Sequence, residues 1–170
     1  MLGAPSKGMV LDAVWEQEAR QGLELSSQPY CRVWCEERLQ TERMRASWCP
    51  GLPTAPHDHG CSTGRIQILI GDFLERRFIF AAGQLSQVSE QRLSSGQASV
   101  CPPGTIHSLE LVSSLGLTSH VYRPISDFMR LFDVVSEELL RVSHCAGAWL
   151  PVPESKVLER SPFARWQFRR

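Results

Sequence analysis

Short apolar runs separated by glycine and proline fill most of the chain, and this pattern limits the possible folds more than any other feature. Runs rich in β-branched and aromatic residues between turn-forming residues predict strands. Gly71-Asp72 predicts a tight hairpin turn, and Gly83 and Gly96 mark later turns. The predicted strands are Arg32–Cys35, Arg43–Trp48, Arg65–Ile70, Phe73–Phe80, Ala98–Cys101, Ser108–Val112 and Leu117–Tyr122. Many short strands at this interval predict an all-β sandwich or barrel.

The two ends of the chain differ from this central region. Apolar residues between Val10 and Gln21 recur at helical spacing, so we expect a short amphipathic helix packed against the barrel. Prolines at 151, 153 and 162 predict an irregular tail. The length of 170 residues suits one domain. We therefore expect a single domain over 1–170, with a helical segment at 1–29, a β-barrel at 30–145 and an irregular tail at 146–170.

Charge and composition favour a small-molecule partner. The 18 basic and 18 acidic residues cancel, so no overall field attracts nucleic acid or an anionic membrane surface. The apolar runs are too short to span a bilayer, and the first residues lack the apolar core of a secretion signal. The six cysteines include no Cys-x-x-Cys pair and are interpreted as free thiols. We expect a cytoplasmic monomer.

Three histidines form the candidate metal site. In an extended strand, side chains alternate faces, so His57 and His59 point to one side and Asp58 to the other. His107 follows Pro102, Pro103 and Gly104, a turn signal that can return the chain beside the first strand. Three imidazoles at this spacing predict a mononuclear metal centre.

The segments around these histidines are similar to the paired motifs of the cupin family of small double-stranded jelly-roll barrels. Gly96, Pro102, Gly104 and His107 match the second motif almost completely. In the first motif, Gly64 follows the histidine pair where most cupins of this pattern carry a glutamate ligand. Three neutral imidazoles leave the charge of a divalent metal available to an anionic ligand such as a thiolate. The resemblance implies a cupin fold, a double-stranded β-helix with a short N-terminal helical segment.

Within the cupins, the chain resembles the cysteine dioxygenase family of thiol dioxygenases from about Tyr30 to Asp133. Tyr30-Cys31-Arg32 is similar to the family's Tyr-x-Arg, whose arginine holds the substrate carboxylate. Trp48 precedes His57 by nine residues, as a tryptophan does in relatives. The segment 118–124, Thr-Ser-His-Val-Tyr-Arg-Pro, is similar to the family's Ser-x-His-x-Tyr-x-Pro. Independently of this resemblance, period-two spacing places Thr118, His120 and Tyr122 on one strand face.

This resemblance implies a specific reaction and a set of roles. The expected enzyme oxidises L-cysteine to cysteine sulfinate with both atoms of O2, as a step of cysteine catabolism toward sulfinates and taurine. Fe(2+) would be held by His57, His59 and His107, with Arg32 and Tyr30 as substrate-binding residues. The catalytic relay would be Tyr122, His120 and Thr118. The resemblance also implies two closing strands around a turn at Ser136, although residues 127–142 carry helical spacing as well.

Several alternatives compete with these roles. The substrate could instead be 3-mercaptopropionate or another small thiol. A cupin that binds or senses a small molecule without catalysis is a rival of another class, and zinc-assisted hydrolysis is a third reading. Arg32 could be a solvated or core-bridging arginine, Tyr30 and Trp48 could be packing residues, and His120 with Tyr122 could form a purely structural polar pair.

Gly64 also bears on the relay tyrosine. In some relatives, a cysteine at the position of Gly64 is joined to that tyrosine by a thioether. Cys61 lies at an odd offset from Gly64, so its side chain is expected on the opposite face of an extended strand. We therefore expect Tyr122 to remain unmodified.

Overall fold

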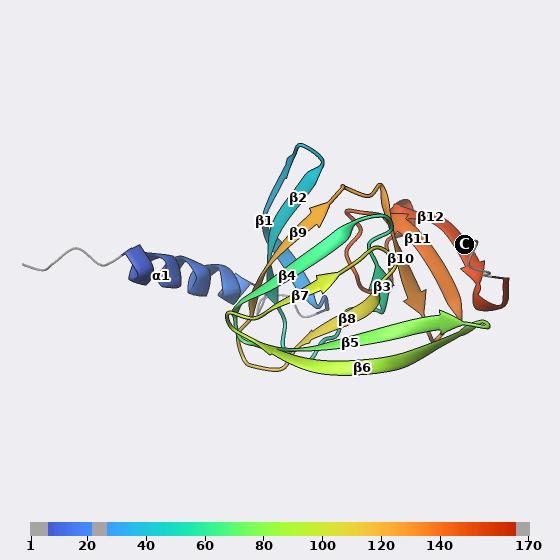
Figure 1. Cartoon of the computed structure of the whole chain (residues 1–170), viewed down its shortest axis with the longest axis horizontal. Helices are drawn as coiled ribbons and strands as arrows, with labels where there is room; N and C mark the ends of the chain where they lie inside the picture. The colour runs from blue at the N-terminus through green and yellow to red at the C-terminus, as the bar shows by residue number, and fades with distance from the viewer. Residues whose placement is uncertain (1–6, 22–26, 166–170) are drawn as a thin grey trace, which may run out of the picture.

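The computed structural model describes residues 7–21 and 27–165 as one helix followed by strands that pair only antiparallel (Figure 1). The helix is α1 (Lys7–Arg20). The strands of the first half are β1 (Tyr30–Arg38), β2 (Thr41–Trp48), β3 (His57–Asp58), β4 (Thr63–Ile70), β5 (Asp72–Ala81) and β6 (Gln84–Ser94). Those of the second half are β7 (Ala98–Cys101), β8 (Ile106–Leu111), β9 (Leu117–Arg123), β10 (Phe128–Asp133), β11 (Glu138–Ser143) and β12 (Val157–Pro162), with the 3-10 turns η2 (Glu154–Lys156) and η3 (Phe163–Arg165).

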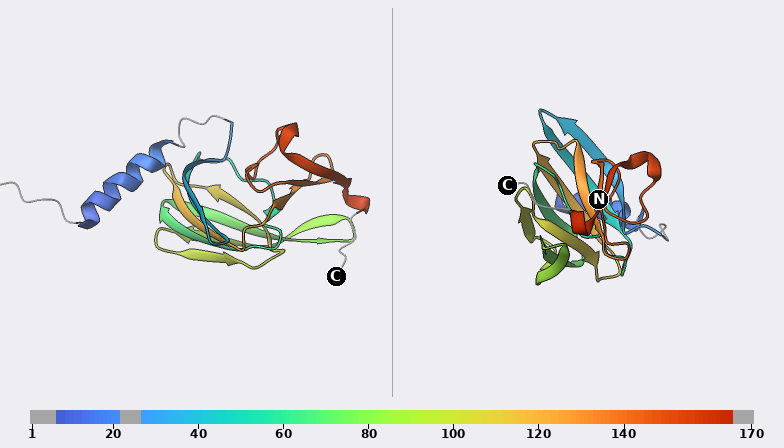
Figure 2. Two further views of the ribbon diagram at one scale, coloured as in Figure 1. Left: turned by 90° about the horizontal axis from the view of Figure 1, so that it is seen from above. Right: turned by 90° about the vertical axis from the view of Figure 1, so that its right-hand side faces the viewer.

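Two sheets make up the body of the molecule. The five-stranded sheet has the order β1-β2-β9-β4-β7, and the seven-stranded sheet has the order β12-β11-β10-β3-β8-β5-β6. The views in Figures 1 and 2 show the two sheets wrapped around a common interior, with α1 extending away from them. The all-β prediction is therefore confirmed.

The core lies between the sheets because each contributes one apolar face. On β2 the buried positions follow the period of two, with Met44, Ala46 and Trp48 inward. Phe73 on β5 packs against Trp48 with their ring centroids 5.3 Å apart. Ile66 on β4 is also fully buried in this cluster. Burial of such side chains contributes roughly 1.5–3 kcal/mol each.

A β-bulge in β1 decides which of its side chains enters the interior. Arg32 pairs with Ala46, but Trp34 pairs with Arg45, so one extra residue of β1 lies between these pairs. Ala46 faces inward, which places Arg32 on the same inner face as Tyr30. Trp34 instead lies outside, where the Arg45 guanidinium covers its ring at 4.7 Å. Simple alternation would have put Arg32 and Trp34 on one face.

The predicted hairpin at Gly71-Asp72 is wrong. Gly71 joins β4 to β5, and these strands belong to different sheets, so the residue carries the chain from one sheet to the other. Its φ of +93° is in the region that favours glycine. A side chain at this position would also collide with the carbonyl oxygen of Leu115. The turn signal was correct, but the connection it makes is a crossing between layers.

The longest strand, β6, was absent from the predicted set. It pairs along β5 at the edge of the seven-stranded sheet, and nearly all of its side chains are exposed or half-buried. Without a buried face it shows no alternation of apolar and polar residues. The turn predicted at Gly83 does join β5 to β6.

The closing segments confirm one prediction and correct another. Strands β10 and β11 pair from Phe128 with Ser143 to Asp133 with Glu138, which confirms two strands around a turn near Ser136. The tail is not wholly irregular as predicted, because β12 pairs along β11. This strand is mostly exposed, so its sequence lacks a clear period-two pattern.

Helix α1 contacts the five-stranded sheet near its C-terminal end. Glu18 forms a two-contact ion pair with Arg45 at 2.7 and 2.8 Å, and Ser47 donates to the carbonyl oxygen of Ala19 at 2.6 Å. The expected helix is therefore present, and this end of it is fastened to β2. Among residues 7–21 and 27–165, no helix combines the length and apolarity needed to cross a membrane.

Candidate metal centre and adjoining cavity

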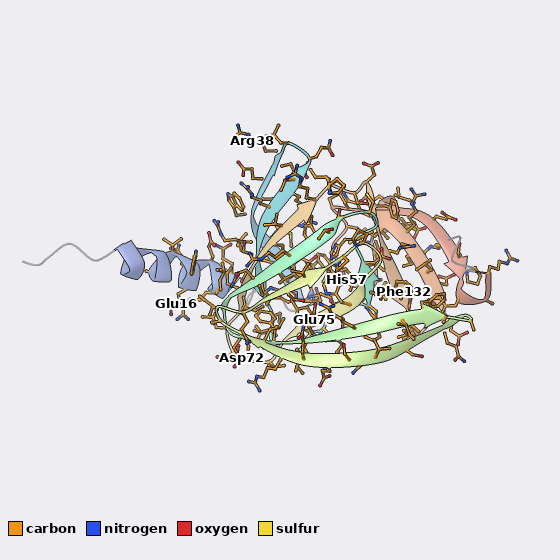
Figure 3. The ribbon with its side chains drawn as sticks, in the orientation of Figure 1. Glu16, Arg38, His57, Asp72, Glu75 and Phe132 are labelled. Atoms are coloured by element: carbon orange, nitrogen blue, oxygen red, sulfur yellow. The ribbon has the colours of Figure 1, made fainter. Side chains whose placement is uncertain are left out.

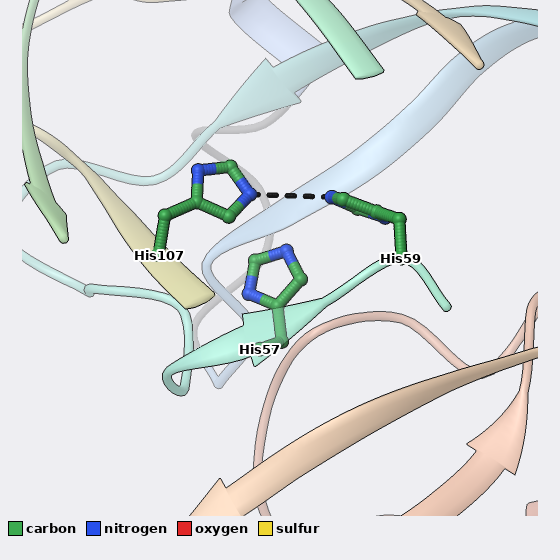
Figure 4. A group of neighbouring side chains, drawn as sticks. All are labelled: His57, His59 and His107. Atoms are coloured by element: carbon green, nitrogen blue, oxygen red, sulfur yellow. Dashed lines mark hydrogen bonds between the residues drawn. The ribbon is translucent and has the colours of Figure 1, made fainter. Parts of the chain in front are cut away.

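The three histidines that the sequence singled out lie side by side in the interior. His57 on β3 pairs with His107 on β8, and His59 follows directly after β3. Nitrogen atoms of the three rings lie within 4.8 Å of one another, and the Nε2 atoms of His59 and His107 are 3.2 Å apart. Figure 4 shows the rings turned toward one another from the two strands. Convergence of this kind suits the binding of one metal ion.

Fixed acceptors hold the outer nitrogen atoms of two of these rings. His57 Nδ1 donates to the carbonyl oxygen of Ala55 at 2.8 Å, and His107 Nδ1 donates to Oε1 of Glu75 at 3.1 Å. Each of these rings can then present an unprotonated Nε2, the form that binds a transition metal. The donor set of three imidazoles therefore fits a mononuclear transition-metal ion.

Burial keeps the histidines of this region neutral, with one exception. Burial and the neighbouring His107 lower the pKa of His57 from 6.5 to about 3, and burial together with His57 lowers the pKa of His59 well below 6.5. Burial acts on His107 in the same direction, but Cys101 and Glu75 outweigh it and raise its pKa to about 9. A metal bound at Nε2 of His107 would replace that second proton.

Glu75 is a buried carboxylate that the sequence interpretation missed. It accepts hydrogen bonds from Ser99 at 2.8 Å and from Gln91 at 2.5 Å, in addition to His107. Burial would raise the pKa of Glu75, but these donors and His107 outweigh it and lower it to about 2. Figure 3 shows Glu75 in the interior near His57. A signal was present, because Glu75 shares the inward face of β5 with Phe73.

Asp58 supports the histidine pair from the opposite side. Its side chain is fully buried and accepts the backbone N–H of Gly60 at 3.0 Å. It also forms an ion pair with Arg130 on the neighbouring β10 at 2.5 Å. As alternation predicted, Asp58 points away from the metal cluster and fixes the backbone between His57 and His59.

Thr118, His120 and Tyr122 form a hydrogen-bonded row on β9, and Trp48 extends it. The indole N–H of Trp48 donates to Thr118 Oγ1 at 2.8 Å. Thr118 Oγ1 lies 2.7 Å from His120 Nε2, and His120 Nδ1 lies 2.9 Å from the Tyr122 hydroxyl. The indole can only donate, so the Thr118 proton is free to go to Nε2. His120 then donates through Nδ1, which leaves the Tyr122 proton for an acceptor in the cavity.

The pKa values of His120 and Tyr122 agree with a row in which both side chains are neutral. Burial, followed by His107 and Arg32, lowers the pKa of His120 to about 3. Burial raises the pKa of Tyr122 well above 10, so the phenol keeps its proton. The ring centroids of Tyr122 and His59 are 4.4 Å apart. The row therefore ends with a protonated phenol beside the candidate metal centre.

Arg32 and Tyr30 border the same cavity, but both already have partners. The Arg32 guanidinium forms an ion pair with Glu42 at 3.4 Å and donates to the carbonyl oxygen of His144 at 3.0 Å. The Tyr30 hydroxyl accepts the backbone N–H of Ala148 at 3.2 Å. Tyr30 also packs within the aromatic core, as its alternative interpretation predicted. Glu42 was not recognised from the sequence, although it stands in the inward alternation of β2.

One cavity connects these groups. Its polar lining includes the three clustered histidines, His120, Tyr122, Arg32 and Glu42. Its apolar walls include Met44, Ile66, Leu109 and Met129. The structure thus brings every predicted site residue to this cavity except Thr118, which lies behind His120.

Comparison with known proteins identifies the fold. No protein-family model matches the sequence, and no curated protein matches it either. The solved structure of KdgF from a Halomonas species matches with a TM-score of 0.50 and 18% identity, over 61% of this chain and 87% of that one. An uncharacterized conserved protein with a double-stranded β-helix domain from Klebsiella pneumoniae matches with a TM-score of 0.50 and 15% identity, over 66% of this chain and 87% of that one.

A recombinant oxalate oxidase in complex with glycolate matches with a TM-score of 0.51 and 16% identity, over 61% of this chain and 55% of that one. This chain therefore spans about half the length of the oxalate oxidase. At these identities the likeness establishes the fold alone: the chain has the cupin fold, a double-stranded β-helix. None of these three structures is described as a thiol dioxygenase.

Proposed function

We propose that the protein is a thiol dioxygenase that oxidises L-cysteine to cysteine sulfinate. The observation that carries the proposal is the meeting of three histidines, a directed row ending at Tyr122, and Arg32 in one cavity. A simple binding pocket has no need of a phenol proton beside a metal centre. The sequence resemblance to cysteine dioxygenases supplies the reaction class, and oxalate oxidase offers an oxidising enzyme with the same fold.

His57, His59 and His107 would hold a single ferrous ion. Such an ion, when bound, supplies adjacent positions for a thiolate and O2, so that the reaction occurs within one complex. Sulfur loses four electrons and O2 gains four, so the reaction needs no outside reductant. Iron is proposed from the resemblance, because three-histidine sites also accept zinc, nickel and copper.

Tyr122 would donate a hydrogen bond to the developing charge on oxygen or sulfur. Its pKa is raised by burial, so it serves as a hydrogen-bond donor and does not ionise at neutral pH. The neutral His120 orients the phenol oxygen from behind, and Thr118 fixes the tautomer of His120. The contribution of such a positioned donor is typically about 10²-fold or more in rate.

Arg32 would bind the substrate carboxylate at the far end of the cavity. Its guanidinium has five N–H donors, so contacts with Glu42 and His144 leave capacity for a further acceptor. Tyr30 would act beside it mainly as a wall, because its hydroxyl is engaged by Ala148. The same end of the cavity would admit 3-mercaptopropionate, which remains the rival substrate.

The setting of the proposed enzyme is a reducing compartment. The six cysteines, all among the described residues, form no disulfides, and we propose a cytoplasmic location. Every group assigned a role comes from one chain, so the proposed site is complete in a monomer.

Oxygen uptake by the iron-loaded protein tests the proposal. Protein reconstituted with ferrous iron under argon is mixed with cysteine, 3-mercaptopropionate or cysteamine in aerated buffer. We expect uptake of one O2 per cysteine consumed, with cysteine sulfinate identified by mass spectrometry and both oxygen atoms derived from ¹⁸O2. Iron binding without thiol-dependent uptake would instead support the rival of a metal-binding cupin without catalysis.

A further inference from the structure

Glu42 occupies an unusual place for a carboxylate. It lies near the start of β2 on the strand's inward face, in the same alternation as Met44 and Ala46, and its side chain is only 6% exposed. Across the sheet it pairs with Tyr122 of β9. The carboxylate therefore lines the cavity at the level of the relay phenol.

The contacts of Glu42 show that its negative charge compensates the positive charge of Arg32. Its Oε1 atom lies 3.4 Å from Arg32 NH1 and 3.7 Å from the Cys35 thiol. Apart from histidines, Arg32 and Glu42 are the charged residues among those that line the cavity in the described part of the chain. Their charges cancel, so the part of the cavity that they line offers no net positive charge to a substrate.

The charges of Arg32 and Glu42 should affect the binding of the three candidate thiols differently. A thiol whose other charged group is a carboxylate, such as 3-mercaptopropionate, must place a second anion beside the buried Glu42. Like charges at short range and low exposure oppose each other strongly. A thiol with an amine gives the Glu42 carboxylate N–H donors in place of a second anion. Cysteine, with both groups, can satisfy Arg32 and Glu42 together.

Building on the proposed function, we propose that Glu42 is a specificity-determining residue, which selects thiols with an amine over thiols with a carboxylate alone. Selection of this kind combines an attractive contact for one substrate with a repulsive contact for its competitor. Glu42 would rank cysteine and cysteamine above 3-mercaptopropionate without touching the metal.

Glu42→Gln tests the proposal because it removes the charge and keeps the shape. Glu36→Gln on the same hairpin is the matched control: Glu36 pairs with the exposed Arg43 at 3.7 Å and does not line the cavity. The ratio of kcat/KM for 3-mercaptopropionate to that for cysteamine is measured in each variant. We expect the ratio to rise at least about tenfold in Glu42→Gln, as loss of one charge contact near a substrate allows, and to stay constant in Glu36→Gln.

Thiol binding to the cobalt(II)-loaded protein under argon gives a readout that needs no turnover. Absorption changes on titration give dissociation constants for the same two thiols, and their ratio should move in the same direction. An unchanged or falling ratio in folded Glu42→Gln protein would overturn the role of Glu42 even if the enzyme is active. Absence of turnover with every thiol would refute the dioxygenase, while the cobalt titrations would still decide the role of Glu42.

Arg32→Gln provides a second variant in case Glu42→Gln does not fold. Removing the guanidinium leaves Glu42 without its counter-charge, so cysteamine should bind the cobalt protein several-fold more tightly. An arginine that only grips carboxylates would leave cysteamine binding unchanged, and that result would contradict the proposal.

Discussion

The two sheets contribute different chemistry to the cavity. The seven-stranded sheet carries the histidine cluster, and two of its members, His57 and His107, are held by acceptors outside the cavity lining, the carbonyl oxygen of Ala55 and Glu75. The five-stranded sheet carries the relay on β9 and the ion pair of Arg32 and Glu42. The relay side chains bond to one another, and Arg32 pairs with Glu42. Metal binding and substrate chemistry are therefore built on separate layers, and mutations should separate them.

The largest effect is expected from His107→Ala on the seven-stranded sheet. This change removes a proposed ligand and leaves the buried Glu75 without its imidazole partner. We expect metal retention and turnover to be lost together, with affinity reduced by more than about 100-fold, because loss of a ligand should exceed the 10–100-fold cost of losing an outer partner. Metal content after gel filtration, with circular dichroism to verify folding, measures this. Full iron occupancy in a folded variant would remove His107 from the ligand set.

Tyr122→Phe on the five-stranded sheet should lower turnover without loss of the metal. The phenyl ring keeps the packing against His59, but the proton donor is lost. We expect unchanged metal content and a kcat lower by about 100-fold, with a much smaller change in KM. Steady-state oxygen uptake on protein of known iron content measures both. Loss of iron in this variant would contradict the assignment of metal binding and substrate chemistry to different sheets.

Glu75→Gln should weaken the metal centre more mildly. Glutamine can still accept from His107 Nδ1, but it lacks the charge that makes the ring a better ligand. Outer partners of this kind typically change metal affinity by about tenfold or more. Competition with a chelator measures affinity, and Glu159→Gln, whose carboxylate is 57% exposed, is the control. Equal affinity in both variants would mean that Glu75 only fills space.

The acid stability of the metal-free protein should depend on His120. Its pKa is near 6.5 in the unfolded chain and about 3 in the folded one, so it is neutral in both states above pH 6.5. As the pH falls from 6.5 toward 3, the unfolded chain takes up a proton that the folded chain refuses, and the free energy of unfolding decreases. The slope reaches about 1.4 kcal/mol per pH unit for one group.

His120→Asn should remove this component, so the stability of the variant should fall less between pH 7 and pH 5. Urea unfolding of both proteins at each pH measures the difference. Parallel curves for wild type and variant would show that His120 is protonated in the folded state.

The smallest expected change is none: Tyr122 should stay unmodified through turnover. A side chain at Gly64 would lie 3.0 Å from the Tyr122 ring, so this is the position from which a thioether would form, and glycine has no sulfur. Cys61 is exposed, but it lies in a turn before β4, so the expected alternation along an extended strand does not apply to it. Intact mass and peptide mapping after incubation with iron, cysteine and air test this. A peptide joining Cys61 to Tyr122 would contradict the strand register described above.

Local regularities made much of the site predictable. The period of two groups His57 with His59, and Thr118 with His120 and Tyr122, because neighbouring side chains of an extended backbone point to opposite faces. Apolar alternation and turn residues predicted most strands in the same way. Strand β6 was not predicted because it buries almost no face, and the outward position of Trp34 could be placed only once the bulge in β1 was known.

The sequence alone determined which side chains share a strand face, since that depends only on the backbone of one segment. Tertiary structure decided which faces meet. Glu75 lies 32 residues from His107, and nothing local links them until β5 pairs with β8. Gly71 was recognisable as a turn, but whether it closes a hairpin or crosses between sheets depends on where the apolar faces of β4 and β5 are buried. The pairing of Arg32 with Glu42 likewise requires the register of two strands, because charge compensation depends on distance in space and not on separation along the chain.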